Sequence, residues 1–185
     1  MVPGPRLGSR SVSDVADWGT LDWTTRSLIA KESHMESKLI TIDDANRMLP
    51  LLRQIVQDIV TNWEQIIAKR TQLEALEKGT GSEIAGLDVR ERDAQVQILK
   101  GELNYLIDRI NNYIREIEDL GCFVEEFKRG IINFPSMYSG RKVFLCWKPG
   151  EAGVCYWHEL DESFNDRTRI TDEREFLYNK PKERG

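Results

Sequence analysis

The feature that most constrains the fold is a heptad repeat of apolar residues shortly before Gly121. One heptad position holds Val96, Leu103, Ile110 and Ile117, and the other holds Leu99, Leu106, Tyr113 and Leu120. A repeat of this period places its apolar side chains along one stripe of an α-helix. Gly121 follows the last of them, where glycine commonly ends a helix in the left-handed conformation. The sequence therefore predicts one long helix that ends at Gly121.

An earlier stretch of the chain carries a second stripe of the same period, formed by Leu52, Ile59, Ile66 and Leu73. Thr41 and Asp44 have the spacing of an N-terminal capping box, with Asp in place of Glu, and they predict that this helix opens at Thr41. Pro50 cannot donate to the preceding turn, so it either kinks the helix or starts a new one. Gly79 and Gly81 lie in a polar run that ends the helix. Two long helices joined by such a turn are expected to pack antiparallel.

After Gly121 the apolar period changes from that of a helix to that of extended chain. The expected extended segments are 122–127, 130–134, 142–147 and 154–160. Pro135 is expected to end the second, and turn-forming residues between the last two predict a β-hairpin. The predicted fold class is α+β: a long antiparallel, coiled-coil-like helical hairpin followed by a small antiparallel β-sheet.

The chain is expected to hold one domain with an extension at each end. The predicted parts are a disordered N-terminal extension (1–37), the helical hairpin (38–121), a small β unit packed on the hairpin in the same domain (122–170), and a flexible tail (171–185). The extension lacks apolar periodicity, and the tail has few apolar side chains. Two interpretations of the extension stay open. Translation begins at Met35 rather than Met1, or the extension is a recognition arm that uses Trp18 and Trp23.

Charge and hydropathy exclude several classes of protein. The chain has 26 basic and 31 acidic residues, a net charge of −5 and no long basic run, so nucleic-acid binding is not expected. No apolar run approaches the roughly 18 residues of a membrane span, and the first residues lack the apolar core of a secretory signal. We therefore expect a cytoplasmic protein without membrane contact. Its three cysteines, Cys122, Cys146 and Cys155, are too few for a disulfide framework and should stay reduced.

Apolar positions outside a single helical seam suggest self-association. These positions are Ile55, Val60, Ile67, Ile98, Ile107 and Ile114. The β unit can cover some of them, and a four-helix arrangement of two copies can cover the rest. The leading hypothesis is therefore a self-associating interaction or scaffold module, at least a homodimer, with room for a protein partner.

The β half contains a polar cluster that could form a binding site. The candidate binding residues are Arg141, Trp147, His158, Glu159 and Arg167, with Asp161 and Arg169 nearby. A histidine among carboxylates and arginines can perform acid–base chemistry on an anionic ligand. Alternatively, His158 and Glu159 anchor the hairpin through hydrogen bonds and an Arg–carboxylate pair. The second functional hypothesis is a small-molecule or anion-binding protein, including a hydrolytic one, and no catalytic residue is assigned.

The register of the expected hairpin bears on metal binding and on the thiols. If Trp147 pairs with Val154, then Cys146 faces Cys155, and Glu159 shares their face of the sheet. Cys146 and Cys155 then lie close enough for a disulfide under oxidation, although small apolar packing is the expectation for a cytoplasmic protein.

Consecutive residues of a strand point to opposite faces, so His158 and Glu159 should separate. In the same register His158 lies near Val143, away from the cysteines, and no metal site or cofactor is expected. Glu159 then needs a cationic partner if it is covered. Arg141, at the start of the neighbouring strand, is the nearest candidate.

Several motifs carry a resemblance to a known family. They are Thr41-Ile-Asp-Asp-Ala-Asn46 with Leu49-Pro50, Asp119-Leu-Gly121, Gly130 with Phe134-Pro135, Gly140-Arg141-Lys-Val143-Phe-Leu-Cys-Trp147, Gly150-Glu151, Tyr156-Trp-His-Glu159, Phe164 and Arg167. With these motifs, residues 41–170 resemble the bacterial domain of unknown function 2203 family. The resemblance implies no established activity. The family usually has Asp where this chain has Asn133, and Gly where it has Ser163. An acid or metal-ligand role for that Asp could not pass to Asn133.

Overall fold

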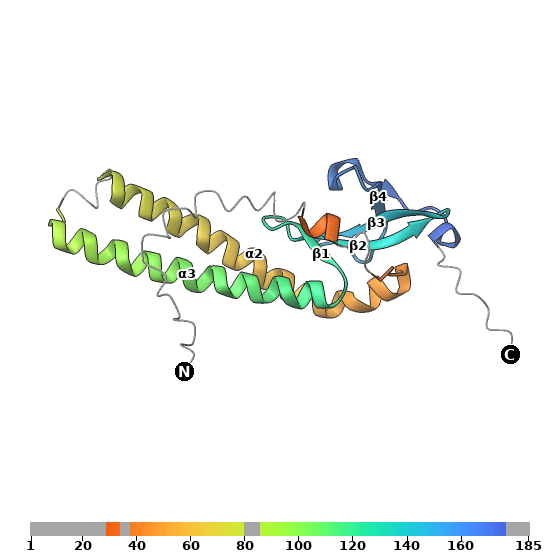
Figure 1. The fold of residues 1–185 in the computed structure, drawn as a ribbon, viewed down its shortest axis with the longest axis horizontal. Coiled ribbons are helices and arrows are strands. Elements are labelled where there is room, and N and C mark those ends of the chain that lie inside the picture. Colours follow the sequence, from red (N-terminus) through yellow and green to blue (C-terminus); the bar gives the residue numbers. More distant parts are fainter. Residues whose placement is uncertain (1–28, 34–37, 80–85, 177–185) are drawn as a thin grey trace, which may run out of the picture.

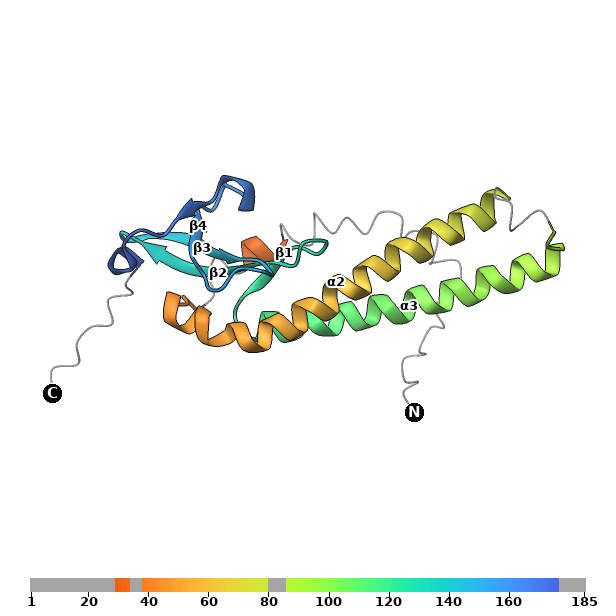
Figure 2. The same cartoon turned by 180° about the vertical axis from the view of Figure 1, so that it is seen from behind.

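The computed structural model describes residues 29–33, 38–79 and 86–176. It is elongated, with two long helices side by side and an antiparallel sheet at one end (Figures 1 and 2). The helices come first along the chain and the five strands follow. The fold is α+β with a helical hairpin, as the sequence predicts. Within the described residues, no helix has the length and apolar character needed to cross a membrane.

The first long helix, α2, spans Ile42–Lys78 and has the ends that its sequence predicts. The backbone N–H of Asp44 donates to the hydroxyl of Thr41 at 3.1 Å, which caps the first turn. Gly79 ends the helix with a φ of 64°, in the left-handed region that glycine adopts without strain. Pro50 lies inside a continuous helix and does not divide it.

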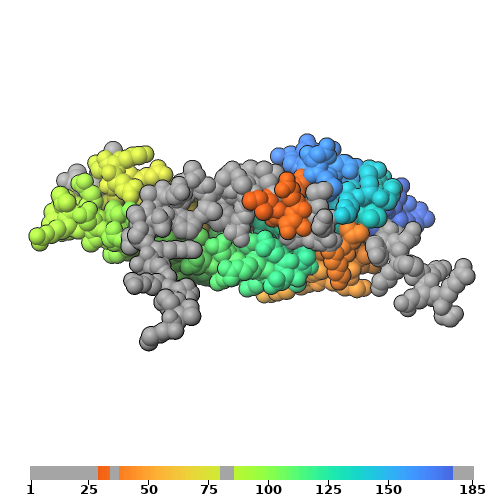
Figure 3. Space-filling view, in the orientation of Figure 1, coloured from red at the N-terminus to blue at the C-terminus, as the bar shows by residue number. Residues whose placement is uncertain are grey.

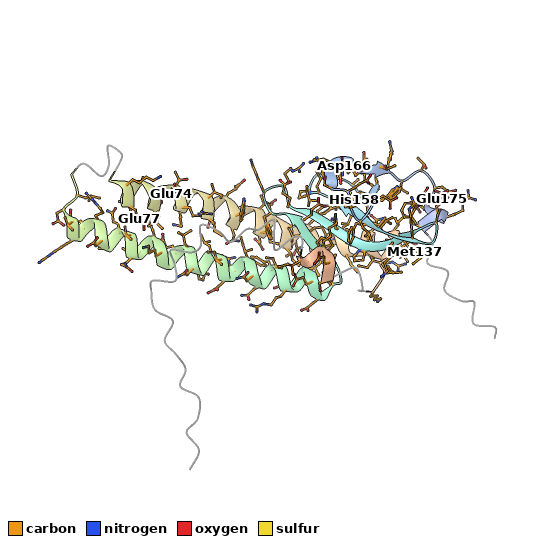
Figure 4. The ribbon with its side chains drawn as sticks, turned by 45° about the horizontal axis from the view of Figure 1, so that its top comes forward. Glu74, Glu77, Met137, His158, Asp166 and Glu175 are labelled. Carbon is orange, nitrogen blue, oxygen red and sulfur yellow. The ribbon has the colours of Figure 1, made fainter. Side chains whose placement is uncertain are left out.

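The second long helix, α3, spans Val89–Asp119 and opens with a reciprocal capping box between Asp88 and Glu91. Its predicted stripe faces α2. The buried apolar residues of α3 are Leu103, Leu106, Ile107, Ile110, Ile114 and Ile117. Charged side chains cover the end of the hairpin that lies far from the sheet (Figure 4), where Lys100 lies 3.2 Å from Glu77.

The apolar positions outside the seam have two different environments. Ile55, Ile107 and Ile114 are buried within the main core, which joins the hairpin to the sheet. Ile67 remains 45% exposed and Ile98 62% exposed. The chain therefore covers part of this apolar surface itself and leaves part of it in contact with solvent.

The sheet has the strand order β1-β2-β3-β4-β5, and every neighbouring pair is antiparallel. The strands are β1 (Phe123–Glu126), β2 (Ile131–Tyr138), β3 (Arg141–Trp147), β4 (Tyr156–His158) and β5 (Thr168–Arg169). One face of the sheet contributes to the core shared with the helices. The opposite face has a small cluster of its own, formed by Ile131, Cys146, Tyr156 and Phe164.

Strand β2 continues through Pro135, where the sequence analysis expected it to end. Pro135 pairs with Phe144 of β3, whereas β1 pairs with β2 only as far as Asn133. Proline is tolerated where a strand has no ladder partner for its missing N–H. The carbonyl of Pro135 instead accepts a hydrogen bond from the N–H of Ile40 at 2.7 Å.

The expected register of the last hairpin, with Trp147 opposite Val154, is wrong by one residue. The observed pairs are Phe144 with His158, Leu145 with Trp157, and Cys146 with Tyr156. Contacts to α2 hold the connecting loop in place. The N–H of Val154 donates to the Asn46 side chain at 2.9 Å, and Arg53 donates to the carbonyl of Ala152 at 2.8 Å. These contacts join distant parts of the chain, so local turn chemistry does not reveal them.

The first residues of the expected flexible tail are ordered. A short 3₁₀ helix, η3, spans Glu173–Phe176. Phe176 is buried, with its ring 4.9 Å from that of Tyr138 and 5.8 Å from that of Trp157. The apolar contacts of this one aromatic side chain explain why residues 171–176 pack on the sheet.

Part of the expected disordered extension is also ordered. Residues 29–33 are helical, and the ammonium of Lys31 donates to the carbonyl of Glu162 at 2.7 Å. Figure 3 shows this segment in orange-red on the surface, beside the blue C-terminal part of the sheet. Met35, Trp18 and Trp23, which carried the two interpretations of the extension, lie outside the described residues.

Candidate functional site

His158, labelled in Figure 4, is the centre of a polar network on the sheet face opposite the core shared with α2 and α3. It has no exposed surface. Its Nδ1 lies 2.8 Å from the carbonyl oxygen of Glu159, and its Nε2 lies 3.4 Å from Oδ1 of Asn133 and 3.5 Å from Oε2 of Glu125. All three neighbours are hydrogen-bond acceptors. Both ring nitrogens of His158 therefore lie beside protein acceptors.

Glu125 enters the network because β1 contains an irregularity. The register of β1 against β2 shifts between Val124 and Glu126, so Glu125 has no partner residue in the ladder. Its carboxylate accepts hydrogen bonds from the Asn133 side chain at 2.6 Å and from the N–H of Phe164 at 2.9 Å. The register shift in β1 thus brings the charged side chain of Glu125 to a buried histidine.

The pKa of Glu125 lies below its usual value. Burial raises this pKa, but hydrogen bonds from His158, the N–H of Phe164 and Asn133 outweigh burial because they stabilise the carboxylate. Glu125 is therefore ionised at neutral pH. It also lines a hollow of about 680 Å³ between the β1–β2 turn and residues 161–166.

Arg167 forms a second ion pair near this sheet face, with Glu151 at 2.6 Å. Its guanidinium lies between two aromatic rings, 3.9 Å from the centre of Tyr156 and 4.0 Å from that of Phe164. Planar guanidinium groups stack favourably on aromatic rings. Trp147, predicted beside Arg167 in a site, is instead buried in the core, and its indole N–H donates to the carbonyl of Glu151 at 3.1 Å.

The expected pair between Glu159 and an arginine forms with Arg141. The Arg141 Nε and Nη2 atoms lie 2.9 and 2.7 Å from Oε1 of Glu159. The guanidinium also lies 4.8 Å from the ring centre of Tyr138. Half of the Arg141 side chain is exposed, so this is a surface pair.

The five candidate residues therefore do not form one site. His158 and Arg167 are linked through Phe164, whose N–H contacts Glu125 and whose ring stacks on Arg167. Glu159 lies just beyond the end of β4, so the expected alternation within one strand does not apply to it, and it pairs with Arg141. The prediction that His158 lies near Val143 is wrong, because the strand register differs by one residue from the expected register. His158 lies opposite Phe144.

Three residues that make these contacts were not predicted from the sequence as site residues. Glu125 gives no signal because a β-bulge cannot be recognised in a single sequence. Glu151 lies in a recognised motif, and Lys31 lies in an extension expected to be disordered. Asn133 was noticed as a departure from the family pattern, but its contacts require the three-dimensional structure.

The cysteines provide no reactive thiol on this face. Cys146 lies opposite Tyr156 and not opposite Cys155, so the expected proximity of the two thiols is wrong. Burial raises the pKa of Cys146 to about 12, although Arg167 opposes the increase. Its thiol is neutral and packs with its apolar neighbours. Across the described ranges, no three His, Cys, Asp or Glu side chains are grouped so as to hold a metal ion.

Fold and site together define a helical-hairpin protein whose terminal sheet contains a buried Glu–Asn–His network. The chain belongs to the family described as uncharacterized conserved protein (DUF2203), whose model matches residues 38–170. The match extends from the entry to α2 as far as the residue after β5, which confirms the resemblance inferred from the motifs. Comparisons with curated proteins and with solved structures give no match.

Proposed function

We propose that this protein is a non-enzymatic interaction module that self-associates through the outer face of α3. The observation that carries the proposal is an exposed apolar stripe, the α3 stripe, made of Ala94, Ile98, Gly101 and Tyr105. Residues three or four apart share one face of a helix, so these four are neighbours. Ile98 and Tyr105 are each 62% exposed, which is unusual for two large apolar side chains so close together.

The α3 stripe is self-complementary in shape. Small and large residues alternate along it, and a Cβ added at Gly101 would meet no atom within 4 Å. Two α3 helices that cross antiparallel, with a two-fold axis between Ile98 and Gly101, bring Ile98 over Gly101 of the second copy. The same operation brings Ala94 opposite Tyr105. Close helix packing needs large side chains to enter spaces left by small ones, and a two-fold contact must be complementary to itself.

Charges at the two ends of the stripe agree with this arrangement. Glu91 precedes Ala94 by one turn, and Arg109 follows Tyr105 by one turn. In the antiparallel pair the two charges of opposite sign lie near one another at both ends. Charge complementarity of this kind favours one orientation over the others.

The polar groups at the sheet end support a structural role better than the hydrolytic alternative. His158 has no exposed surface, and both of its ring nitrogens already face protein acceptors. A general base must reach the proton that it abstracts. The neutral thiol of Cys146 is also unsuited to nucleophilic attack, which requires the thiolate.

The test is the mass of the full chain in solution over a concentration series, measured by sedimentation or light scattering. We expect the wild type to move from monomer to dimer as concentration rises. Ile98→Glu places a charge in the contact and should weaken it by about 2 kcal/mol, roughly 30-fold in Kd. Ile67→Glu, an equivalent change at an exposed isoleucine of α2, is the control and should dimerise like the wild type.

Two results would contradict the proposal. One is a wild type that stays monomeric at every accessible concentration. The other is an equal effect of Ile98→Glu and Ile67→Glu, since the association would then depend on general surface hydrophobicity and not on the α3 stripe.

A further inference from the structure

The hollow at the sheet end combines aromatic walls with carboxylates. We call it the β1 hollow. Its described lining is Lys31, Trp63, Glu125, Glu126, Phe127, Lys128, Arg129, Asp161, Glu162, Ser163, Phe164, Asn165 and Asp166. The rings of Trp63 and Phe127 stack with their centres 5.7 Å apart. A volume of about 680 Å³ is in the range of small-molecule sites.

An ammonium group already occupies part of this region. The Nζ of Lys31 donates to the carbonyl oxygen of Glu162 at 2.7 Å and lies 5.5 Å from the ring centre of Phe144. A backbone carbonyl and an aromatic ring face are both features that attract cations. Neither depends on the cation being part of the same chain, so the structure itself shows that the surroundings accept an ammonium group.

The segment that carries Lys31 has few apolar side chains buried against the sheet. Within residues 29–33, Ile29 is 61% exposed, and Glu32 and Ser33 are exposed as well. Burial of apolar surface is the main source of stability for a docked segment. The hydrogen bond of Lys31 to Glu162 and its contact with the Phe144 ring fix the ammonium by polar and cation–π contacts, which a competing ammonium group can replace.

The charges around the β1 hollow favour a cationic occupant. Five carboxylate side chains line it against three cationic ones, of which Lys31 is the occupant. Arg129 and Glu126 neutralise each other in an ion pair, which leaves four carboxylates against Lys31 and Lys128. The carboxylate of Glu125 is stabilised in its ionised form by its hydrogen bonds. The field at the hollow is negative, and low-dielectric aromatic walls strengthen such a field.

We propose that the β1 hollow is a binding site for an alkylammonium group, and that Lys31 is an intramolecular occupant that competes with the ligand. The ammonium takes the place of the Lys31 ammonium at the carbonyl of Glu162 and the ring of Phe144, and the alkyl part lies in the hollow. The same chemistry is offered by a free primary amine and by a lysine side chain of another protein. This site is independent of the α3 stripe.

The test is calorimetric titration of the full chain with defined probes. The probes are butylamine, N-acetyl-lysine methylamide and, as the uncharged analogue of the second, N-acetyl-norleucine methylamide. Removing an internal competitor raises the apparent affinity by the reciprocal of the fraction of sites that the competitor left free. Lys31→Ala should therefore bind the two amines about tenfold or more tightly than the wild type does. Lys128→Ala is the matched control, because it removes the same charge from the same hollow without removing the occupant.

Each outcome decides the proposal. Tighter binding of an amine by Lys31→Ala, with Lys128→Ala close to the wild type, supports it. Binding of butylamine alone points to a free small amine, and binding of the lysine derivative as well points to a lysine of a protein partner. The proposal is overturned if Lys31→Ala binds neither amine at millimolar concentration, if both variants gain equally, or if the norleucine analogue binds as well as the lysine derivative.

Discussion

A fully buried histidine has to satisfy both of its ring nitrogens within the protein. Around His158 the acceptors are a backbone carbonyl, an amide oxygen and the carboxylate of Glu125. Asn133 connects the two side chains, because its amide nitrogen donates to Glu125 while its oxygen faces His158. A buried hydrogen bond contributes little on balance, but the loss of one partner is costly because it leaves the other buried polar group unsatisfied. The network therefore fixes the local structure more than it adds net stability.

Replacing Glu125 with Gln should destabilise the protein by about 2 kcal/mol at neutral pH, because the new amide brings a donor toward either the Asn133 amide or the backbone N–H of Phe164, which also donate. Glu126→Gln is the control. Its carboxylate pairs with Arg129 at the surface, where such pairs contribute at most about 1 kcal/mol. Urea denaturation of both variants measures their loss of unfolding free energy. Equal losses would show that the buried network contributes no more to stability than the surface pair.

The same variant has a predicted pH dependence. The folded-state pKa of Glu125 lies below its usual value of 4.5, so its carboxylate adds stability above that value. This stability is lost as the pH falls through the folded-state pKa. The difference in unfolding free energy between the wild type and Glu125→Gln should therefore become smaller below pH 4.5. A gap that stays constant down to the acid transition would contradict the assigned role of the carboxylate.

At the scale of the elements, the β1–β2 turn packs closely against α2. Gly130 has a φ of 64°, and a Cβ built there would lie 2.4 Å from Cγ1 of Val56 and 3.2 Å from Cγ2 of Val60. Glycine is therefore required for two reasons, the left-handed backbone and the absence of space. The turn places β1, and with it Glu125, against the hairpin.

Gly130→Ala should cost about 2–4 kcal/mol, from a strained backbone and from overpacking against α2. Gly140→Ala is a matched control, because Gly140 also has a positive φ of 83° but its Cβ would meet nothing within 4 Å. We expect that variant to lose about 1 kcal/mol, the backbone contribution alone. The comparison uses urea unfolding, and a loss at Gly140 as large as that at Gly130 would refute the close-packing explanation.

Elements that depend on nearby residues were predictable from the sequence, and those that depend on distant contacts were not. Thr41 and Gly79 mark the ends of α2 through local hydrogen bonds and backbone conformation, which a sequence pattern records. The hairpin register is set instead by contacts of Asn46 and Arg53 with the loop, far along the chain. The Arg141–Glu159 pair was predictable because Arg141 stands at the start of the neighbouring strand, whereas the position of Glu125 followed from a bulge that no pattern revealed.

At the scale of the whole molecule, the two proposed surfaces lie in different regions. The α3 stripe belongs to the part of α3 nearer the far end of the hairpin, whereas the β1 hollow lies at the sheet end (Figure 1). A dimer formed along α3 leaves the hollow of each copy accessible. Such a protein would present two equivalent amine sites at a distance set by the helical hairpin.

Oxidative cross-linking between two different single variants is the direct test of self-association through the α3 stripe. Cys155, the exposed native thiol, is first replaced by Ser in both chains. One chain then carries Ile98→Cys and the other Gly101→Cys, and the two are mixed. Facing residues of closely packed helices are near enough for a disulfide. If the α3 stripes face each other, the mixture of Ile98→Cys with Gly101→Cys forms a linked heterodimer faster than a mixture of Ile98→Cys with Ile67→Cys. Equal rates in the two mixtures, or no linked dimer in either, would contradict self-association through the α3 stripe.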